Sequence, residues 1–221
     1  MCGRFTLTTD LEQLEMRFSF RATNLSAQPR YNIAPSQQVL AVIGAEERRA
    51  GFLRWGLIPS WAKEPSIGDR MINARAETLA EKPSFRRALQ KRRCIVLADG
   101  FYEWKAEGKK KTPMYITLKS HEPFGFAGLW ETWKSPADET IHSCTLITTT
   151  PNTLMESIHN RMPVILSREA EAQWLDPATT APERLLPLLT PHPAEAMEAY
   201  AVSLAVNSPR NDAPVCIEPI N

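Results

Sequence analysis

Short, apolar, β-rich runs that succeed one another without a helix between each pair constrain the fold of this chain most strongly. Such runs occupy residues 37–43, 52–58, 94–98, 145–150 and 162–166. A doubly wound parallel sheet requires strands that alternate regularly with helices, and this sequence does not supply that alternation. We therefore predict an α+β fold with a curved, largely antiparallel, barrel-like β core and short peripheral helices.

Helical patterns are short and lie outside these runs. Residues 9–20 read as a helix in which Thr9 and Glu12 have the spacing of a capping box. Pro83 suits the first position of a second helix, because its missing N–H would have no partner there. From Ser167 onward the pattern is helical and includes residues 193–200.

Turn residues define the remaining segments. Residues 101–105 and 113–119 flank the sequence EGKKK, which predicts a β-hairpin. Residues 59–80 contain prolines and a glycine but no sustained period, so we expect an irregular loop. A last strand-like run covers residues 200–206.

Length and composition indicate a globular protein. The chain has 221 residues, of which 43% are hydrophobic and 23% are charged. It contains no apolar run long enough for a membrane helix and no apolar signal segment at its start, so we expect a cytoplasmic protein without membrane contact. Because no repeat or linker is apparent, we expect a single domain over residues 1–221.

The net charge of +1 conceals an uneven distribution. Residues 168–221 carry 8 acidic and 3 basic side chains, whereas the preceding residues carry 17 acidic and 23 basic ones. The densest basic run, residues 82–93, contains no acid. Such a run suits either a solvated helix face or a modest phosphate-binding surface, and charge alone does not decide between them.

The four cysteines are widely spaced, without a C-x-x-C pair or a histidine at metal-ligand spacing, so we expect no metal site. Cys94 and Cys144 lie in apolar runs and are predicted to be buried hydrophobic residues. Cys2 differs because it becomes the first residue once Met1 is removed. It then carries an α-amine with a pKa of about 8 beside a thiol with a pKa of about 8.5.

An amine and a thiol on adjacent carbons have a special reaction with aldehydes. The amine forms a Schiff base, and the thiol then adds to the imine carbon and closes a thiazolidine ring. Acyl transfer is the other chemistry open to such a residue. Gly3 gives the terminus room, and Phe5 and Leu7 alternate as in a strand that anchors it. The alternative is a frayed terminus at which residue 2 is arbitrary.

Three polar positions suggest further site residues. Asn73 could orient a small polar group and Arg75 a phosphate, unless both only cap the loop. Glu103 lies among aromatic residues, which would raise its pKa and suit proton transfer, unless it alternates out to solvent. His159 lies in a loop between a helix and a strand, where an acid–base group or a structural histidine fits. The remaining histidines are predicted to lie on the surface, namely His121, His142 and His192.

Several motifs resemble, in order and spacing, the SOS-response-associated peptidase (SRAP) family of abasic-site-processing proteins, particularly its bacterial members. They are MCGRF (1–5), YNIAPSQ (31–37), RWGLIPSWA (54–62), INARAET (72–78), ADGFYEW (98–104), FAGLWE (126–131), IHNRMPVIL (158–166) and VNSP (206–209). The resemblance extends over nearly the whole chain and implies one SRAP-like domain.

The resemblance implies that the processed Cys2 forms a thiazolidine with the ring-opened aldehyde of an abasic site in single-stranded DNA. It implies acid–base roles for Glu103 and His159, with Glu103 also linked to removal of Met1, and a role for Asn73 in holding the lesion sugar. The DNA contacts it implies are Arg4, Arg75, Trp61 and, as an extension of that surface, Arg86. It implies no cofactor or metal, association with the nucleoid, and replication or repair factors as further partners.

The sequence departs from the family pattern at two places. Asn160 replaces an aspartate that commonly follows the histidine, which would affect crosslink reversal if that acid orients His159. Leu97 replaces a frequent proline.

Several other protein classes compete with this family. Class II glutamine amidotransferases also begin Met-Cys-Gly, but the chain lacks room for their second domain. Two further classes fit the residues, namely a cysteine peptidase that pairs Cys2 with His159 and a non-covalent reader of single-stranded or modified DNA.

Overall fold

The core of the computed structural model, which describes residues 2–220, is a closed five-stranded barrel. Its strands follow the order β10-β4-β3-β6-β9, and β9 pairs back with β10 to close the ring. Four of the five pairings are antiparallel, and only β4 and β10 are parallel. The barrel strands are β3 (Gln38–Ile43), β4 (Arg49–Trp55), β6 (Arg93–Ala98), β9 (Phe124–Lys134) and β10 (Thr140–Thr149). The predicted α+β fold with a curved, largely antiparallel core is confirmed.

A second sheet carries the N-terminal segment. Its strand order is β13-β8-β7-β1-β2, and every pairing in it is antiparallel. These strands are β1 (Phe5–Leu7), β2 (Arg30–Ile33), β7 (Gly100–Glu107), β8 (Lys110–Leu118) and β13 (Met197–Ala201). The hairpin predicted around EGKKK is the β7–β8 turn, in which Gly108 has a φ of 62°.

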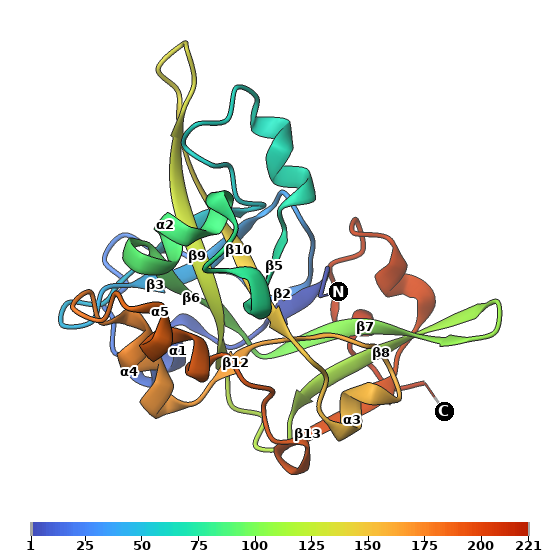
Figure 1. Cartoon of the computed structure of the whole chain (residues 1–221). Coiled ribbons are helices and arrows are strands. Elements are labelled where there is room, and N and C mark those ends of the chain that lie inside the picture. Colours follow the sequence, from blue (N-terminus) through green and yellow to red (C-terminus); the bar gives the residue numbers. More distant parts are fainter. Residues whose placement is uncertain (1, 221) are drawn as a thin grey trace.

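Short elements surround the two sheets (Figure 1). Figure 1 shows α1, α4 and α5 gathered on one side, and α2 lies against β9. The helices are α1 (Leu11–Phe18), α2 (Pro83–Lys91), α3 (Thr153–Glu156), α4 (Arg168–Leu175) and α5 (Pro182–Leu185). The 3-10 turns are Pro65–Arg70, Ala76–Thr78, Leu186–Leu188, Ala194–Ala196, Leu204–Asn207 and Pro214–Cys216, and the shortest strands are β5 (Asn73–Arg75), β11 (Met162–Pro163) and β12 (Ile165–Leu166). Within residues 2–220, no helix is long and apolar enough to cross a membrane.

Aromatic packing anchors the start of the chain in the core. Phe5 is fully buried, and its ring lies 5.1 Å from that of Trp55 and 5.7 Å from that of Phe126. Burying such a side chain stabilises the fold by about 1.5–3 kcal/mol. The terminus next to Phe5 is therefore held in place, and the alternative of a frayed N-terminal segment does not apply to residues 2–7.

Two helix predictions need correction. The first helix is capped by Asp10, whose side chain accepts a hydrogen bond from the Gln13 amide at 2.9 Å, and not by Thr9. The segment predicted as helix over residues 193–200 forms one 3-10 turn and then β13. Five residue pairs between β13 and β8 extend the second sheet, and this tertiary pairing outweighs the local helical pattern.

Of four further predictions, two are confirmed and two need correction. Pro83 begins α2 as expected, and Cys94 and Cys144 are buried. The segment 59–80 is not wholly irregular, because it contains two 3-10 turns and β5. Of the histidines predicted to lie on the surface, His192 is half-buried.

Candidate active site around Cys2

The register of β1 against β7 brings the N-terminus to Glu103. Phe5 pairs with Phe101, and the Tyr102 amide donates to the Arg4 carbonyl at 2.9 Å. Because the two strands are antiparallel, continuing this register past Arg4 places the residues before it beside Glu103. Cys2 is completely buried there. The site therefore begins where the first strand of the chain meets β7.

Asn73 holds Cys2 from the other side. It lies on β5, which pairs in parallel with β10 through Asn73 and Leu146. The Asn73 side-chain amide donates to the Cys2 carbonyl at 2.7 Å. Its Oδ1 atom is buried and accepts no hydrogen bond from the described part of the chain. Asn73 thus fixes the backbone of Cys2 and presents a buried acceptor at the same place.

Glu103 and His159 complete the cluster. The Glu103 side chain is 4% exposed, and its Oε2 atom lies 4.0 Å from Nε2 of His159. Tyr102 and Trp104, the neighbours on the strand, belong to a separate cluster on the opposite face of β7. The alternative in which Glu103 alternates out to solvent is therefore wrong. Burial raises the pKa of the Glu103 carboxyl, and the charge of His159 offsets part of that rise.

The Cys2 thiol lies in a strongly desolvated environment. Burial is the main cause that raises its pKa far above the ordinary value, and the Glu103 carboxylate adds to the rise. A thiol in such surroundings keeps its proton at neutral pH, whereas thiolate nucleophiles of cysteine peptidases have depressed pKa values. The electrostatics thus disfavour chemistry that starts from a Cys2 thiolate in the unprocessed chain.

Arg161 is a site residue to which the sequence analysis assigned no role. Its backbone N–H donates to Nδ1 of His159 at 3.1 Å. Its guanidinium donates to both carboxylate oxygens of Glu77, at 2.6 and 2.9 Å, and to the Thr148 carbonyl at 2.7 Å. Arg161 therefore orients the imidazole and ties it to β10. The side chain of Asn160 is exposed, so the departure from the family pattern lies on the surface.

Asp99 is a second residue that sequence reasoning missed. It is 7% exposed, and its Oδ2 atom accepts hydrogen bonds from the backbone N–H and the hydroxyl of both Thr8 and Thr9. Its Oδ1 atom accepts from the Thr6 hydroxyl at 2.6 Å. The carboxylate thus clamps the end of β1, which fixes the strand that positions Cys2.

The late VNSP motif and the YNIAPSQ motif form another clamp on the N-terminal segment. Nη1 of Arg4 donates to Asn32 at 2.7 Å and to the Val206 carbonyl at 2.6 Å. The Trp104 indole donates to Asn207 at 2.8 Å, and the Arg4 guanidinium lies 5.8 Å from the Trp104 ring. These contacts give Arg4 a structural task and leave fewer of its donors for a phosphate.

The other predicted DNA contacts are exposed. Arg75 follows Asn73 on β5, and the Trp61 side chain in the loop after β4 is 61% exposed. Arg86 is exposed on α2, which packs against β6 and β9. The structure therefore brings Cys2 together with the clusters predicted around Asn73, Glu103 and His159, and it places Arg86 on a separate element. Within residues 2–220, no group of three or more His, Cys, Asp and Glu side chains could hold a metal ion.

Comparison with known proteins assigns a family to this fold and site. The SOS response associated peptidase (SRAP) family model matches residues 1–209, and the chain belongs to this family. It is 53% identical over 222 residues to the abasic site processing protein YoqW of Bacillus subtilis (strain 168), with 99% of each chain covered. It is 35% identical over 225 residues to the Xenopus tropicalis abasic site processing protein HMCES, covering 87% of this chain and 67% of that one. A crystal structure of a Bacteroides thetaiotaomicron protein matches with a TM-score of 0.90 at 28% identity, covering 100% of both chains.

Proposed function

We propose that this protein processes abasic sites and that it captures them covalently in single-stranded DNA through Cys2. The observation that carries the proposal is the meeting of Cys2, Asn73, Glu103 and His159 in one buried cluster. Relatives that match this chain nearly end to end are named abasic site processing proteins. We further propose that residues 1–221 act as one SRAP-like domain, because most buried side chains belong to one continuous cluster.

The first step belongs to the amine of Cys2. Removal of Met1, a residue outside the described part of the chain, frees that amine, which attacks the ring-opened aldehyde of the lesion. The carbinolamine that forms loses water to give an imine. A carboxyl whose pKa burial has raised can deliver the proton that the departing water requires, and this is the role we assign to Glu103.

The thiol acts second. The Cys2 sulfur forms a bond to the imine carbon, the C=N double bond becomes single, and the thiol proton passes to the nitrogen. This order agrees with the raised pKa of the buried thiol, because a protonated thiol is a poor first nucleophile. The thiazolidine product keeps the lesion attached to the protein and protects it during the DNA damage response.

The surrounding residues position the lesion. The buried Oδ1 atom of Asn73 suits a hydroxyl of the ring-opened sugar as donor. His159, oriented by Arg161, assists ring opening and crosslink reversal. We assign phosphate contacts to Arg75 and, as an extension of that surface, to Arg86, and base stacking to the exposed Trp61. Arg4 contributes to DNA contact through the donors that its protein partners leave available.

Crosslinking to a defined oligonucleotide tests the proposal. Single-stranded DNA with one abasic site should yield a heat-stable adduct on a denaturing gel. The matched control is the same strand with a tetrahydrofuran analogue, which has no aldehyde. Cys2→Ala should lose the adduct, and Cys2→Ser should form only a reversible imine. An adduct of unchanged yield in Cys2→Ala, or one on the tetrahydrofuran strand, contradicts covalent capture through Cys2.

Removal of Met1 is a separate part of the proposal. We propose that it occurs either by an aminopeptidase or by the site itself, with Glu103 as the acid–base. The intact mass of Glu103→Gln, purified beside the wild-type protein, distinguishes the two routes. Met1 retained only in the variant supports self-processing, whereas Met1 absent from both supports an aminopeptidase. Met1 retained in an active wild-type protein contradicts the requirement for its removal.

A further inference from the structure

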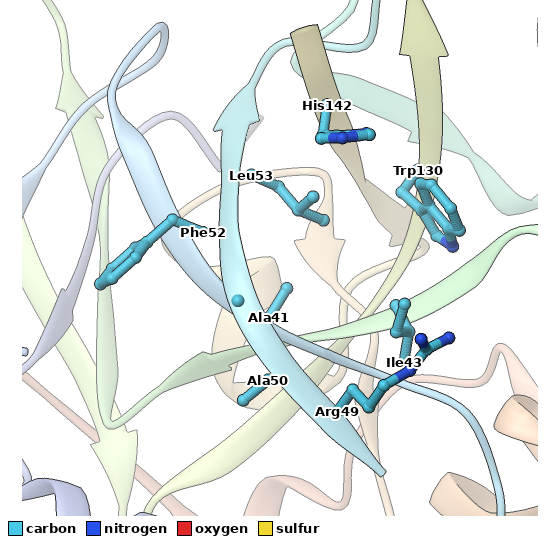
Figure 2. A pocket seen from close by; sticks show the side chains of 9 residues that line it. Ala41, Ile43, Arg49, Ala50, Phe52, Leu53, Trp130 and His142 are labelled. Atoms are coloured by element: carbon cyan, nitrogen blue, oxygen red, sulfur yellow. The ribbon is translucent and has the colours of Figure 1, made fainter. Parts of the chain in front are cut away.

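The barrel has a seam between β4 and β10 that lies away from the Cys2 cluster. Strand β4 pairs with β3 from Arg49 to Arg54, but with β10 only through Arg54 and Trp55. Toward Arg49 the two strands diverge and leave a groove of about 360 Å³ (Figure 2). Among the residues of β4 only Trp55 is buried, whereas every residue of β6 is. The groove is thus an opening in the barrel wall.

The backbone of β4 presents free hydrogen-bonding groups to this groove. The Trp55 amide donates to the Gln37 carbonyl, and the Ser36 amide donates to the Trp55 carbonyl, so the Trp55 groups point to the β3 side. Because the direction alternates along an antiparallel strand, the amides of Ala50 and Phe52 point to the groove. Within residues 2–220, the groove side of β4 pairs with other backbone only on either side of Ala50 and Phe52. Arg48 forms a bridge with Phe20, and β10 pairs with β4 from Arg54 onward.

Gly51 supports the same conclusion. It lies in the middle of this open edge, and a Cβ atom built on it would meet nothing within 4 Å. A glycine inside a strand often marks a position where another backbone approaches closely. Gly51 therefore leaves open space over the face of β4 that lines the groove, where the side chains of an added strand would lie.

The side chains around the groove are mostly apolar, and exposed cations lie at one end of it. Figure 2 shows Leu53, Ile43, Trp130 and His142 around the space beside β4, with Arg49 at its end. A smaller adjoining pocket shares Ile43, Arg49 and Trp130 and adds the exposed Lys91, whereas Arg93, which also lines it, is buried and donates to backbone carbonyls. No aspartate or glutamate lines either pocket, whereas Glu46 and Glu47 line a further pocket that shares Arg49 and Ala50 and also contains Arg21 and Arg48. The groove thus favours a ligand that is apolar on one face and negatively charged.

We propose that this groove binds an extended acidic segment of a partner protein, which adds to β4 as a further strand. Backbone hydrogen bonds to Ala50 and Phe52 would supply affinity, and alternate side chains would enter the apolar groove. A nucleic acid fits less well, because the Arg92 guanidinium lies over the Trp130 ring at 5.3 Å and His142 stands edge-on to it. Those contacts occupy surfaces that a base would need for stacking.

The probe is a capped hexapeptide of alternating glutamate and valine, titrated into the purified full-length protein. Amide chemical-shift changes should concentrate at Ala50, Phe52 and His142. A peptide of the same sequence that is N-methylated at every residue cannot donate from either edge and should not bind, and a lysine–valine peptide should bind far more weakly. Absence of binding by the acidic peptide, equal binding by either control peptide, or stronger binding by a short abasic-free oligothymidine at the same residues overturns the proposal.

Two variants at one position separate the backbone from the side chain. Phe52→Pro removes the outward N–H and leaves the ladder with β3, whereas Phe52→Ala keeps the N–H and removes the exposed ring. We expect Phe52→Pro to weaken peptide binding about tenfold relative to Phe52→Ala, as the loss of one backbone hydrogen bond would. Both variants should retain DNA crosslinking, which shows that they fold. Equal peptide affinity of the two folded variants contradicts strand addition.

Discussion

Replacing Glu103 by glutamine should make the protein more stable and less active at once. The Glu103 side chain is 4% exposed, and burial raises its pKa, so the native state bears a cost for the ionised carboxylate. Glutamine has nearly the same shape and no charge. We expect Glu103→Gln to increase the free energy of unfolding by about 0.5–2 kcal/mol near neutral pH, the range that a single stabilising substitution commonly yields.

The pH dependence follows from the direction of the shift. Below the ordinary carboxyl pKa, Glu103 is protonated in the folded and the unfolded chain, and its burial carries no charge penalty. As the pH rises through that value, the unfolded chain ionises first and native stability falls until the folded carboxyl has ionised too. The advantage of the glutamine variant should therefore be largest near neutral pH and disappear at about pH 4.

Urea unfolding at both pH values, together with single-turnover crosslinking, checks this prediction. Crosslinking by Glu103→Gln should slow by about 10²–10⁴-fold, the usual contribution of a general acid–base group. Glu77→Gln is the control of opposite sign, because a hydrogen bond from Arg161 lowers the Glu77 pKa. Its half-exposed carboxylate stabilises the fold above the ordinary pKa by at most about 1 kcal/mol, and this contribution is lost on acidification. A Glu103→Gln variant that is less stable than the wild-type protein near neutral pH contradicts a cost of the buried carboxylate, and one that crosslinks equally fast contradicts its role in proton transfer.

Four further substitutions test the site, of which three change its supports and one changes the exposed residue Asn160. Asn73→Ala removes the 2.7 Å bond to the Cys2 carbonyl, and we expect crosslinking to slow about tenfold in single-turnover assays with a stability loss of about 1 kcal/mol. Asp99→Asn weakens charge-assisted bonds to two backbone N–H groups, and urea unfolding should show a loss of about 1–3 kcal/mol with faster amide exchange at the end of β1. Arg161→Lys cannot make the paired bonds to Glu77, and we expect the pH profile of crosslinking to shift. Asn160→Asp changes an exposed side chain, and we expect urea unfolding to show unchanged stability.

Local sequence signals pointed to those residues of the candidate site whose proposed chemistry resides in one side chain. Cys2 was recognised from its position, and Glu103 from its aromatic neighbours on a strand. The alternating pattern of Phe5 and Leu7 predicted an anchored terminus, and both residues are buried. Alternation also predicted the β7–β8 hairpin. These features depend on neighbours within a few residues, and such neighbours are visible in the sequence.

Residues whose role depends on distant partners could not be recognised in this way. Arg161 bonds to Glu77, which lies 84 residues earlier, and Asp99 bonds to residues 90 or more positions away. Residues 193–200 carry a helical pattern locally, yet pairing with β8 makes most of them a strand. The motifs IHNRMP and ADG contained Arg161 and Asp99, but only the fold shows what their side chains contact.

The intact mass of the nuclease-trimmed adduct, measured before and after borohydride treatment, tests most directly whether Cys2 closes a thiazolidine ring on the abasic site. Both an imine and a thiazolidine form with loss of one water, but borohydride adds two hydrogens only to the imine. We expect a protein that lacks Met1 and an adduct on Cys2 whose mass borohydride leaves unchanged. An adduct on another residue, one formed by a chain that retains Met1, or one that gains two hydrogens would contradict ring closure at Cys2.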